Sequence, residues 1–180
     1  NPDAPFVLYL DFDGHVTTST NWLDPTDSEN CWDGVSAPFN GDDAAIREIW
    51  QRVAEDYAPF DVDVTTRADL DDTVVDQRVV VSPTNFLADC GVSGSANVLG
   101  VAFLNTFGRS QETPAFAFSG QPWATTRTVA ETISHESGHT FGLRHDGRTR
   151  SGTDDEYYFG HGEWAPIMGN PTSRRVTQWS

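Results

Sequence analysis

Three histidines and a glutamate lie close enough in the sequence to form a catalytic metal site. His135, Glu136, His139, Gly142 and His145 follow the pattern H-E-x-x-H-x-x-G-x-x-H. Histidines four residues apart lie on the same face of a helix, so the first two imidazoles can converge on one metal ion. A glycine can adopt positive φ, which ends a helix and turns the chain sharply. This turn would bring the third histidine back to the same ion.

The types of residue also indicate what the metal would do. Three neutral imidazoles leave the fourth position of a tetrahedral zinc ion open for water, as catalytic zinc sites require. Glu136 would accept a proton from that water as general base and pass it to the leaving amine. The plainer alternative is a His-rich helix end that binds no metal. Three of the five histidines in the chain fall in this one pattern, which favours the zinc site.

Residues 132–146 resemble the zinc-binding motif of the metzincin clan of metallopeptidases. That clan carries a methionine turn downstream of the third histidine. Met168 is the only methionine in the chain and lies where the turn is expected, although a lone methionine can also fill a core. Asp146 directly follows the third histidine, as in the reprolysin and adamalysin branch. The resemblance therefore implies that Asp146, Met168 and Gly142 support the metal ligands, with a surface charge as the alternative for Asp146.

One position departs from the clan. Asn170 stands two residues after Met168, where several branches have a tyrosine near the zinc. Tyr157 and Tyr158 are close in sequence, but nothing in the sequence places either of them at the metal. His161 is a further candidate for the metal or the substrate, with a solvated loop histidine as the alternative.

The hydrophobic pattern predicts the elements that would position the motif. Helical spacing predicts two long helices, at residues 41–57 and 125–141, and apolar or alternating runs predict five strands, at residues 6–12, 61–66, 77–82, 97–105 and 114–119. This order predicts an α/β (α+β) fold with a mostly parallel, twisted, five-stranded sheet. The fold is the one that the metzincin resemblance implies.

The resemblance also implies where a substrate binds. Residues 97–105 take the place of the antiparallel edge strand that lines the cleft in the clan. An extended protein or peptide substrate would add to this strand through main-chain hydrogen bonds. The expected substrate contacts are Val98, Gly100, Val101, Ala102 and Phe103.

The length of the chain fits one catalytic domain over residues 1–180. We expect an upper α/β subdomain at residues 1–142 and a small, irregular lower subdomain at residues 143–180 that carries Met168. The chain ends twelve residues after Met168, where the clan usually continues into a helix. We therefore interpret the C-terminus as either native or trimmed.

Charge and composition exclude some classes of partner. The net charge of −16 opposes binding to nucleic acid and to anionic membranes. No apolar run approaches the roughly 20 residues that a membrane span needs. The sequence starts without a signal peptide, which we interpret as the mature or trimmed form of a secreted protein, expected to be a monomer.

Two further features have more than one interpretation. Cys31 and Cys90 predict a single disulfide in an exported protein, with two free thiols in a cytosolic enzyme as the alternative. Acidic residues at strand ends and loops are candidates for structural calcium, with solvated turns as the alternative; they are Asp11, Asp13, Asp69, Asp71 and Asp72.

Together these observations predict a secreted, zinc-dependent endopeptidase of metzincin type. One alternative is a zinc hydrolase that acts on a non-peptide amide. Another is a non-catalytic binding module that keeps zinc for structure. Glu136 argues against the second alternative, because a structural zinc site needs no general base and tends to close its fourth position.

Overall fold

The fold is built on a mostly parallel, five-stranded sheet. The structure is a computed structural model that describes residues 1–2, 4–19, 21–23, 32–150 and 153–180. Along the sheet the strands follow the order β4-β1-β5-β7-β6. Only β6 runs antiparallel to its neighbour, and it forms one edge. The predicted sheet is confirmed, with strands β1 (Phe6–Asp11), β4 (Val62–Thr65), β5 (Gln77–Ser82), β6 (Gly100–Val101) and β7 (Ala115–Phe118).

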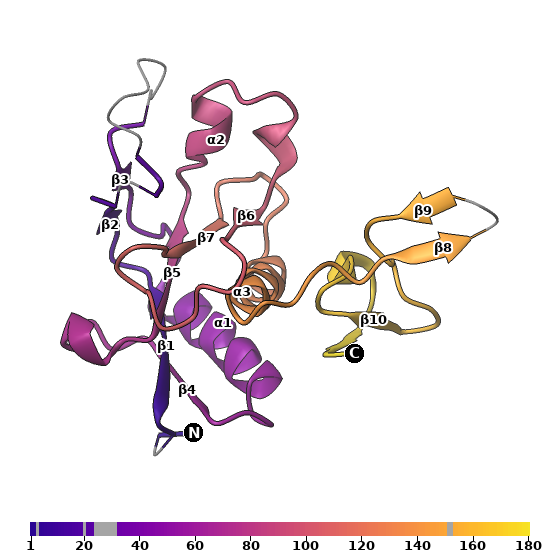
Figure 1. Cartoon of the computed structure of the whole chain (residues 1–180), viewed down its shortest axis with the longest axis horizontal. Helices are drawn as coiled ribbons and strands as arrows, with labels where there is room; N and C mark the ends of the chain where they lie inside the picture. Colours follow the sequence, from indigo (N-terminus) through magenta and orange to yellow (C-terminus); the bar gives the residue numbers. More distant parts are fainter. Residues whose placement is uncertain (3, 20, 24–31, 151–152) are drawn as a thin grey trace.

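Two long helices cover one face of this sheet, as predicted. Helix α1 (Asp43–Asp56) starts where the Asp42 side chain accepts a hydrogen bond from the Ala45 amide, and α3 (Thr126–Thr140) starts at Thr125 in the same way. The helices lie side by side against the sheet (Figure 1). Their apolar side chains form the main core with alternate sheet residues, including Leu8, Leu10, Val79, Val81, Ala115 and Ala117.

A second, aromatic core lies on the other face of the sheet. Val80 and Phe116 point to this face because side chains alternate along a strand. Trp32 and Phe86 stack over them with ring centroids 4.0 Å apart. Phe86 and Leu87 of this cluster come from α2 (Phe86–Asp89). The other short elements before β6 are β2 (His15–Val16), β3 (Val35–Ser36) and η2 (Ser95–Asn97).

The predicted disulfide has one of its two cysteines, Cys90, among the described residues. Cys31 lies outside the described residues. Cys90 ends α2 and is not a free cysteine. The pairing of Cys31 with Cys90 therefore stays a prediction.

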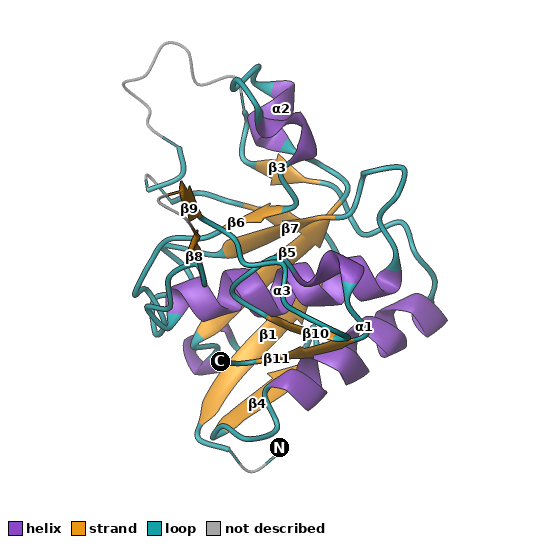
Figure 2. Cartoon of the chain, turned by 90° about the vertical axis from the view of Figure 1, so that its right-hand side faces the viewer, coloured by secondary structure: helices purple, strands orange, loops and turns teal. Residues whose placement is uncertain are grey.

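The segment after α3 lies on the side of that helix away from the sheet (Figure 1). It contains two small sheets, an antiparallel pair and a parallel pair. Figure 2 shows the parallel pair crossing in front of α1 and α3. Trp179 fixes its end, because the indole N–H donates to the Asp56 carbonyl at 2.8 Å. The elements are β8 (Arg148–Arg150), β9 (Thr153–Asp155), β10 (Trp164–Pro166), η3 (Pro171–Ser173) and β11 (Val176–Gln178).

The edge strand is much shorter than the predicted residues 97–105. The helix η2 takes up the first of these residues, and β6 consists of Gly100 and Val101 only. At the other end Asn105 has φ of 59°, which turns the chain. The Asn105 amide then donates to the His139 carbonyl at 2.9 Å, so this segment leaves the sheet to complete the end of α3.

Three of the acidic residues considered for calcium, Asp11, Asp69 and Asp72, pair with arginine side chains. Asp11 is buried and pairs with Arg78, which also pairs with Asp72 (η1, Asp72–Val74). Asp69 pairs with Arg67, and His15, for which the sequence suggests no partner, lies 3.5 Å from Asp11. Over the described residues, the one group of His, Cys or acidic side chains positioned for a metal is His135, His139 and His145. In the same residues, no helix is long and apolar enough to cross a membrane.

Candidate metal centre

Helix α3 presents His135 and His139 one turn apart and ends directly after them. Gly142 has φ of 92°, and its amide donates to the His139 carbonyl at 2.8 Å. The Leu143 amide donates to the Gly138 carbonyl at 3.1 Å. These two bonds form a Schellman motif, in which a left-handed glycine stops the helix and reverses the chain. The predicted role of Gly142 in ending the helix is thus seen in its backbone.

The reversal brings His145 back against the other two histidines. One nitrogen from each of the three rings lies within 4.8 Å of the others. The Nε2 atoms of His139 and His145 are 3.1 Å apart. The structure therefore brings together the three predicted ligands.

Each of the three rings is oriented by a hydrogen bond from its far nitrogen. Nδ1 of His135 lies 2.8 Å from the Ile167 carbonyl, and Nδ1 of His139 lies 2.8 Å from the Leu143 carbonyl. For His145 the partner is a Glu156 carboxylate oxygen, at 2.9 Å. Carbonyl and carboxylate oxygens only accept, so each Nδ1 carries the proton. The three Nε2 lone pairs then face one another, an arrangement that a cation bound between them would stabilise.

Burial favours the neutral form of two of the imidazoles, those of His135 and His139. Desolvation lowers the pKa of His135 to about 4 and also lowers the pKa of His139. Both rings are therefore neutral at pH 7, and neutral imidazole is the form that binds metal. This donor set of three nitrogens suits zinc.

Glu136 lies against the edge strand. Its side chain is buried, and desolvation raises its pKa to about 8. A methyl group on Gly100 would lie 2.6 Å from Cγ of Glu136 and 2.8 Å from its Oε1. Gly100 is therefore where the strand and the carboxyl side chain come closest, and glycine is the residue that fits.

A cavity of about 300 Å³ opens beside His135 and Glu136. One wall comes from the edge strand and the turn before it, and the opposite wall comes from the chain after Met168. Helix α3 lies between them. The lining residues are Asn97, Val98, Leu99, Gly100, Glu131, Thr132, His135, Glu136, Tyr157, Gly169, Asn170, Pro171 and Thr172.

The sequence profile of metallo-peptidase family M12 matches residues 61–180, two thirds of the chain and all of this site. The chain belongs to metallo-peptidase family M12. The predicted metzincin-like metallopeptidase is thereby confirmed.

Among solved structures, the chain is similar to that of myroilysin, with 12% sequence identity and a TM-score of 0.41. The match covers 79% of this chain and 50% of that chain, so the protein spans about half the length of the solved chain. No curated protein sequence matches it.

Met168 of this metallopeptidase packs directly beneath the ligand-bearing helix. A methyl group on Gly138 would lie 2.5 Å from the Met168 sulfur and 3.0 Å from the Trp179 ring. Gly138 thus makes room for two side chains of the C-terminal segment. The buried Met168 also links to the third ligand, because the Asp146 amide donates to the Met168 carbonyl at 2.8 Å.

Asp146 acts in the structure mainly through its backbone. Its carbonyl accepts from the Tyr158 amide at 2.6 Å, while its carboxylate accepts from the Ser180 hydroxyl at 2.7 Å. It therefore connects the chain beyond His145 to the methionine turn. The carboxylate that supports a histidine ligand belongs to Glu156.

Two residues at the metal centre could not be placed there from the sequence. Glu156 holds His145, and the Tyr157 ring lies 4.1 Å from the His145 ring between centroids. Tyr157 also lines the cavity. Their position depends on the β8–β9 hairpin, which returns the chain to the site. Glu156 and Tyr157 belong to no periodic pattern of residues, so the sequence carries no signal that they lie at the metal centre. His161 lies elsewhere and contacts Tyr158.

The predicted substrate contacts divide into two groups. Val98 and Gly100 line the cavity. Val101 and Ala102 pack against the two cores, and the Phe103 ring lies 4.3 Å from Trp22. Only the first group faces the metal centre.

Proposed function

We propose that the protein is a secreted, zinc-dependent endopeptidase in which Glu136 is the general base. The observation that supports this best is the arrangement of one buried carboxyl group beside three converging Nε2 atoms, at the mouth of a cavity. A structural zinc site would close its fourth position with a protein ligand. Within the described residues, no fourth His, Cys or acidic side chain joins this group.

His135, His139 and His145 would hold the zinc ion. When bound, zinc supplies a strong electrophile that makes water a better acid and polarises a carbonyl oxygen. The hydrogen bonds from each Nδ1 keep the rings in the required orientation, which raises their strength as ligands.

Glu136 would move the proton. Its buried carboxyl has a pKa near 8 in the protein alone, and a cation bound nearby would favour the carboxylate. In that form Glu136 can accept a proton from water and give it to the leaving amine. Gly100 leaves the room that this side chain occupies, because a methyl group on Gly100 would clash with it.

The substrate would be a peptide in extended form. Strand β6 is an edge of the sheet, so one side of its backbone has no strand partner among the residues that the structure describes. A peptide added along this side would pass both the metal centre and the cavity, since Gly100 lines that cavity. We further propose that the protein acts outside the cell as a monomer, with a Cys31–Cys90 disulfide.

The test uses the zinc-loaded protein and a library of quenched fluorescent peptides. Replacing the base, Glu136→Ala, should retain one zinc and reduce kcat/KM by about 10²–10⁴-fold. Replacing a ligand, His145→Ala, should lower both zinc content and turnover. Glu163→Ala is the control, because that exposed carboxylate lies outside the site. Turnover by Glu136→Ala at the wild-type rate would refute the role of the base.

A further inference from the structure

Glu131 forms a wall between two cavities. It lines the cavity of about 300 Å³ beside the metal centre and also a second cavity of about 670 Å³ on the side of α1 and β11. The residue is only 7% exposed. It lies one helical turn before His135 on α3. A side chain that enters the smaller cavity would therefore lie beside Glu131.

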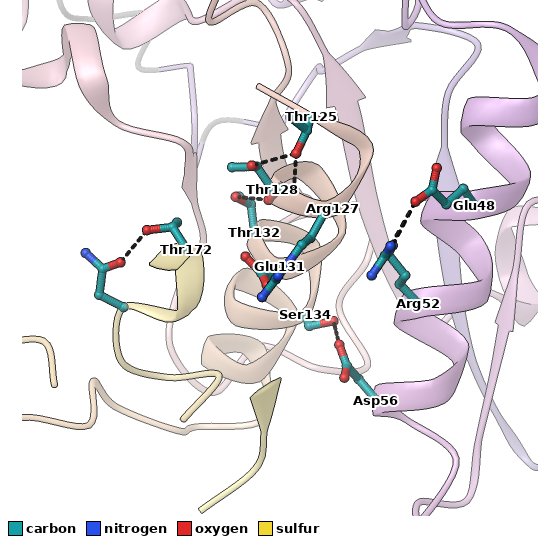
Figure 3. Close-up of polar contacts among 11 residues, drawn as sticks. Glu48, Arg52, Asp56, Thr125, Arg127, Thr128, Glu131, Thr132, Ser134 and Thr172 are labelled. Carbon is teal, nitrogen blue, oxygen red and sulfur yellow. Dashed lines mark hydrogen bonds and ion pairs between the residues drawn. The ribbon is translucent and has the colours of Figure 1, made fainter. Parts of the chain in front are cut away.

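Part of the Glu131 carboxylate is left for a ligand. Arg127 Nε donates to its Oε1 at 2.7 Å. No other hydrogen bond reaches this carboxylate from the residues that the structure describes. Arg127 lines the larger cavity but not the smaller one. Figure 3 shows the pair along α3, with the segment of Thr172 across from it.

We infer that the cavity beside the metal centre takes a long cationic side chain of the substrate, lysine or arginine, and that Glu131 selects it. This inference rests on the proposed peptidase function and specifies its substrate class. It makes Glu131 a specificity-determining residue rather than a catalytic one.

The charges around the cavity favour a cation. Its lining contains no basic side chain besides the metal ligand His135, whereas it contains Glu131 and Glu136. The remaining walls are uncharged, with Asn170 and Thr172 on one side and the η2–β6 segment on the other. Burial raises the pKa of Glu131 although Arg127 and Arg52 both act on it, which means that its carboxylate is poorly solvated and that a further cation would stabilise it. An acidic substrate side chain would meet repulsion here and in the protein's net charge of −16.

The size of the cavity also fits. A space of about 300 Å³ has room for on the order of ten water molecules, more than the heavy atoms of a lysine side chain. The apolar stem of such a side chain would pass Val98 and Leu99, and its charged end would reach the helix.

Binding without turnover tests the inference. The probes are three blocked, fluorescently labelled hexa-alanine peptides in which one central residue is lysine, norleucine or glutamate. They are titrated into zinc-loaded Glu136→Ala protein, which retains Glu131 as the carboxylate in the cavity. A charge-assisted hydrogen bond is worth about 1.5–3 kcal/mol. The lysine peptide should therefore bind about 10- to 100-fold more tightly than the norleucine peptide, and the glutamate peptide most weakly.

The lysine advantage is the ratio of the affinity for the lysine peptide to that for the norleucine peptide. When Glu131→Gln is added to Glu136→Ala, this ratio should fall to less than about threefold. The control Glu163→Gln also removes one negative charge and should leave the ratio unchanged. Arg127→Met in the same background frees both Glu131 oxygens and should increase the advantage. That variant also decides the matter if Glu131→Gln fails to fold. Equal binding of lysine and norleucine peptides, no binding of any peptide, or an advantage that survives Glu131→Gln would overturn the inference.

Turnover separates this inference from the proposed function. A wild-type protein that binds the lysine peptide but cleaves no peptide would refute the peptidase and support the role of Glu131. Cleavage without preference for basic residues would refute the role of Glu131 alone.

Discussion

The contact between Gly100 and Glu136 gives a sharp test of the site. Gly100→Ala adds one methyl group, which would lie 2.6 Å from Cγ of Glu136 and 2.7 Å from the Phe116 carbonyl oxygen. Ordinary contacts begin at 3.4 Å, so about 0.8 Å of movement is needed. Phe116 is fully buried and its strand is paired on both sides, so it cannot retreat. Either β6 or the Glu136 side chain must move.

Both movements predict the same pattern of results. A misplacement of about 1 Å at a catalytic group can cost about 100-fold in rate, so kcat/KM should fall by about 10- to 100-fold. Zinc content should stay unchanged, because no metal ligand is touched. Overpacking costs typically about 1–3 kcal/mol, and about 2–4 °C is lost for each kcal/mol in a chain of this size. The melting temperature should therefore fall by about 2–12 °C.

The assay measures kcat/KM on a fluorogenic peptide, zinc by mass spectrometry and melting by calorimetry. Gly162→Ala is the matched control. Its methyl group meets open space, but the φ of 56° makes alanine strained there. It should lose stability and keep full activity. Wild-type kcat/KM in Gly100→Ala would show that Glu136 is not held by the edge strand.

Three further predictions follow from other contacts. Glu156→Gln should weaken zinc binding about tenfold in a chelator competition, because His145 loses a charged acceptor; unchanged affinity would contradict this. Gly138→Ala should lower the melting temperature, because the added methyl group clashes with the Met168 sulfur. This holds although alanine favours a helix over glycine by about 1 kcal/mol. Adding Met168→Ala to that variant should recover part of the loss, because it removes the clashing sulfur. Burial raises the pKa of Asp56 from 3.8 to about 6, so the folded protein holds a proton that the unfolded chain loses, and stability falls as pH rises from about 4 to 6. Asp56→Asn should remove the part of that fall that Asp56 causes and gain at most about 3 kcal/mol at pH 7, at about 1.4 kcal/mol per pH unit; a pH profile of unfolding that matches the wild type would refute this.

The sequence was sufficient for the features that depend on local spacing. Histidines at i and i+4, a glycine at the helix end and short apolar or alternating runs of residues each have a short-range physical cause. They predict α3, the turn at Gly142 and the five strands of the sheet, and all three are present. Even the methionine beneath the site could be placed, since a resemblance fixed its approximate distance from His145.

Features that depend on contacts between distant segments were not predicted. The edge strand ends early because Asn105 completes α3 rather than continuing in the sheet. No pattern within residues 97–105 shows this, since the partner lies in a helix far along the chain. Glu156 and Tyr157 reach the site through a hairpin whose orientation no local propensity sets. The closeness of Gly100 to Glu136 likewise appears only when strand and helix are packed together.

The hydrogen bond from His135 to Ile167 has a consequence for how the protein matures. The two residues are 32 positions apart, and the bond spans from α3 to the methionine turn. A nascent chain that has emerged only as far as α3 contains His135 and His139. It still lacks His145 and the Ile167 carbonyl that aligns the ring of His135. Metal capture and docking of the last segment are therefore linked in one equilibrium, and each strengthens the other. The order of synthesis thus delays assembly of the metal centre until the methionine turn has been synthesised.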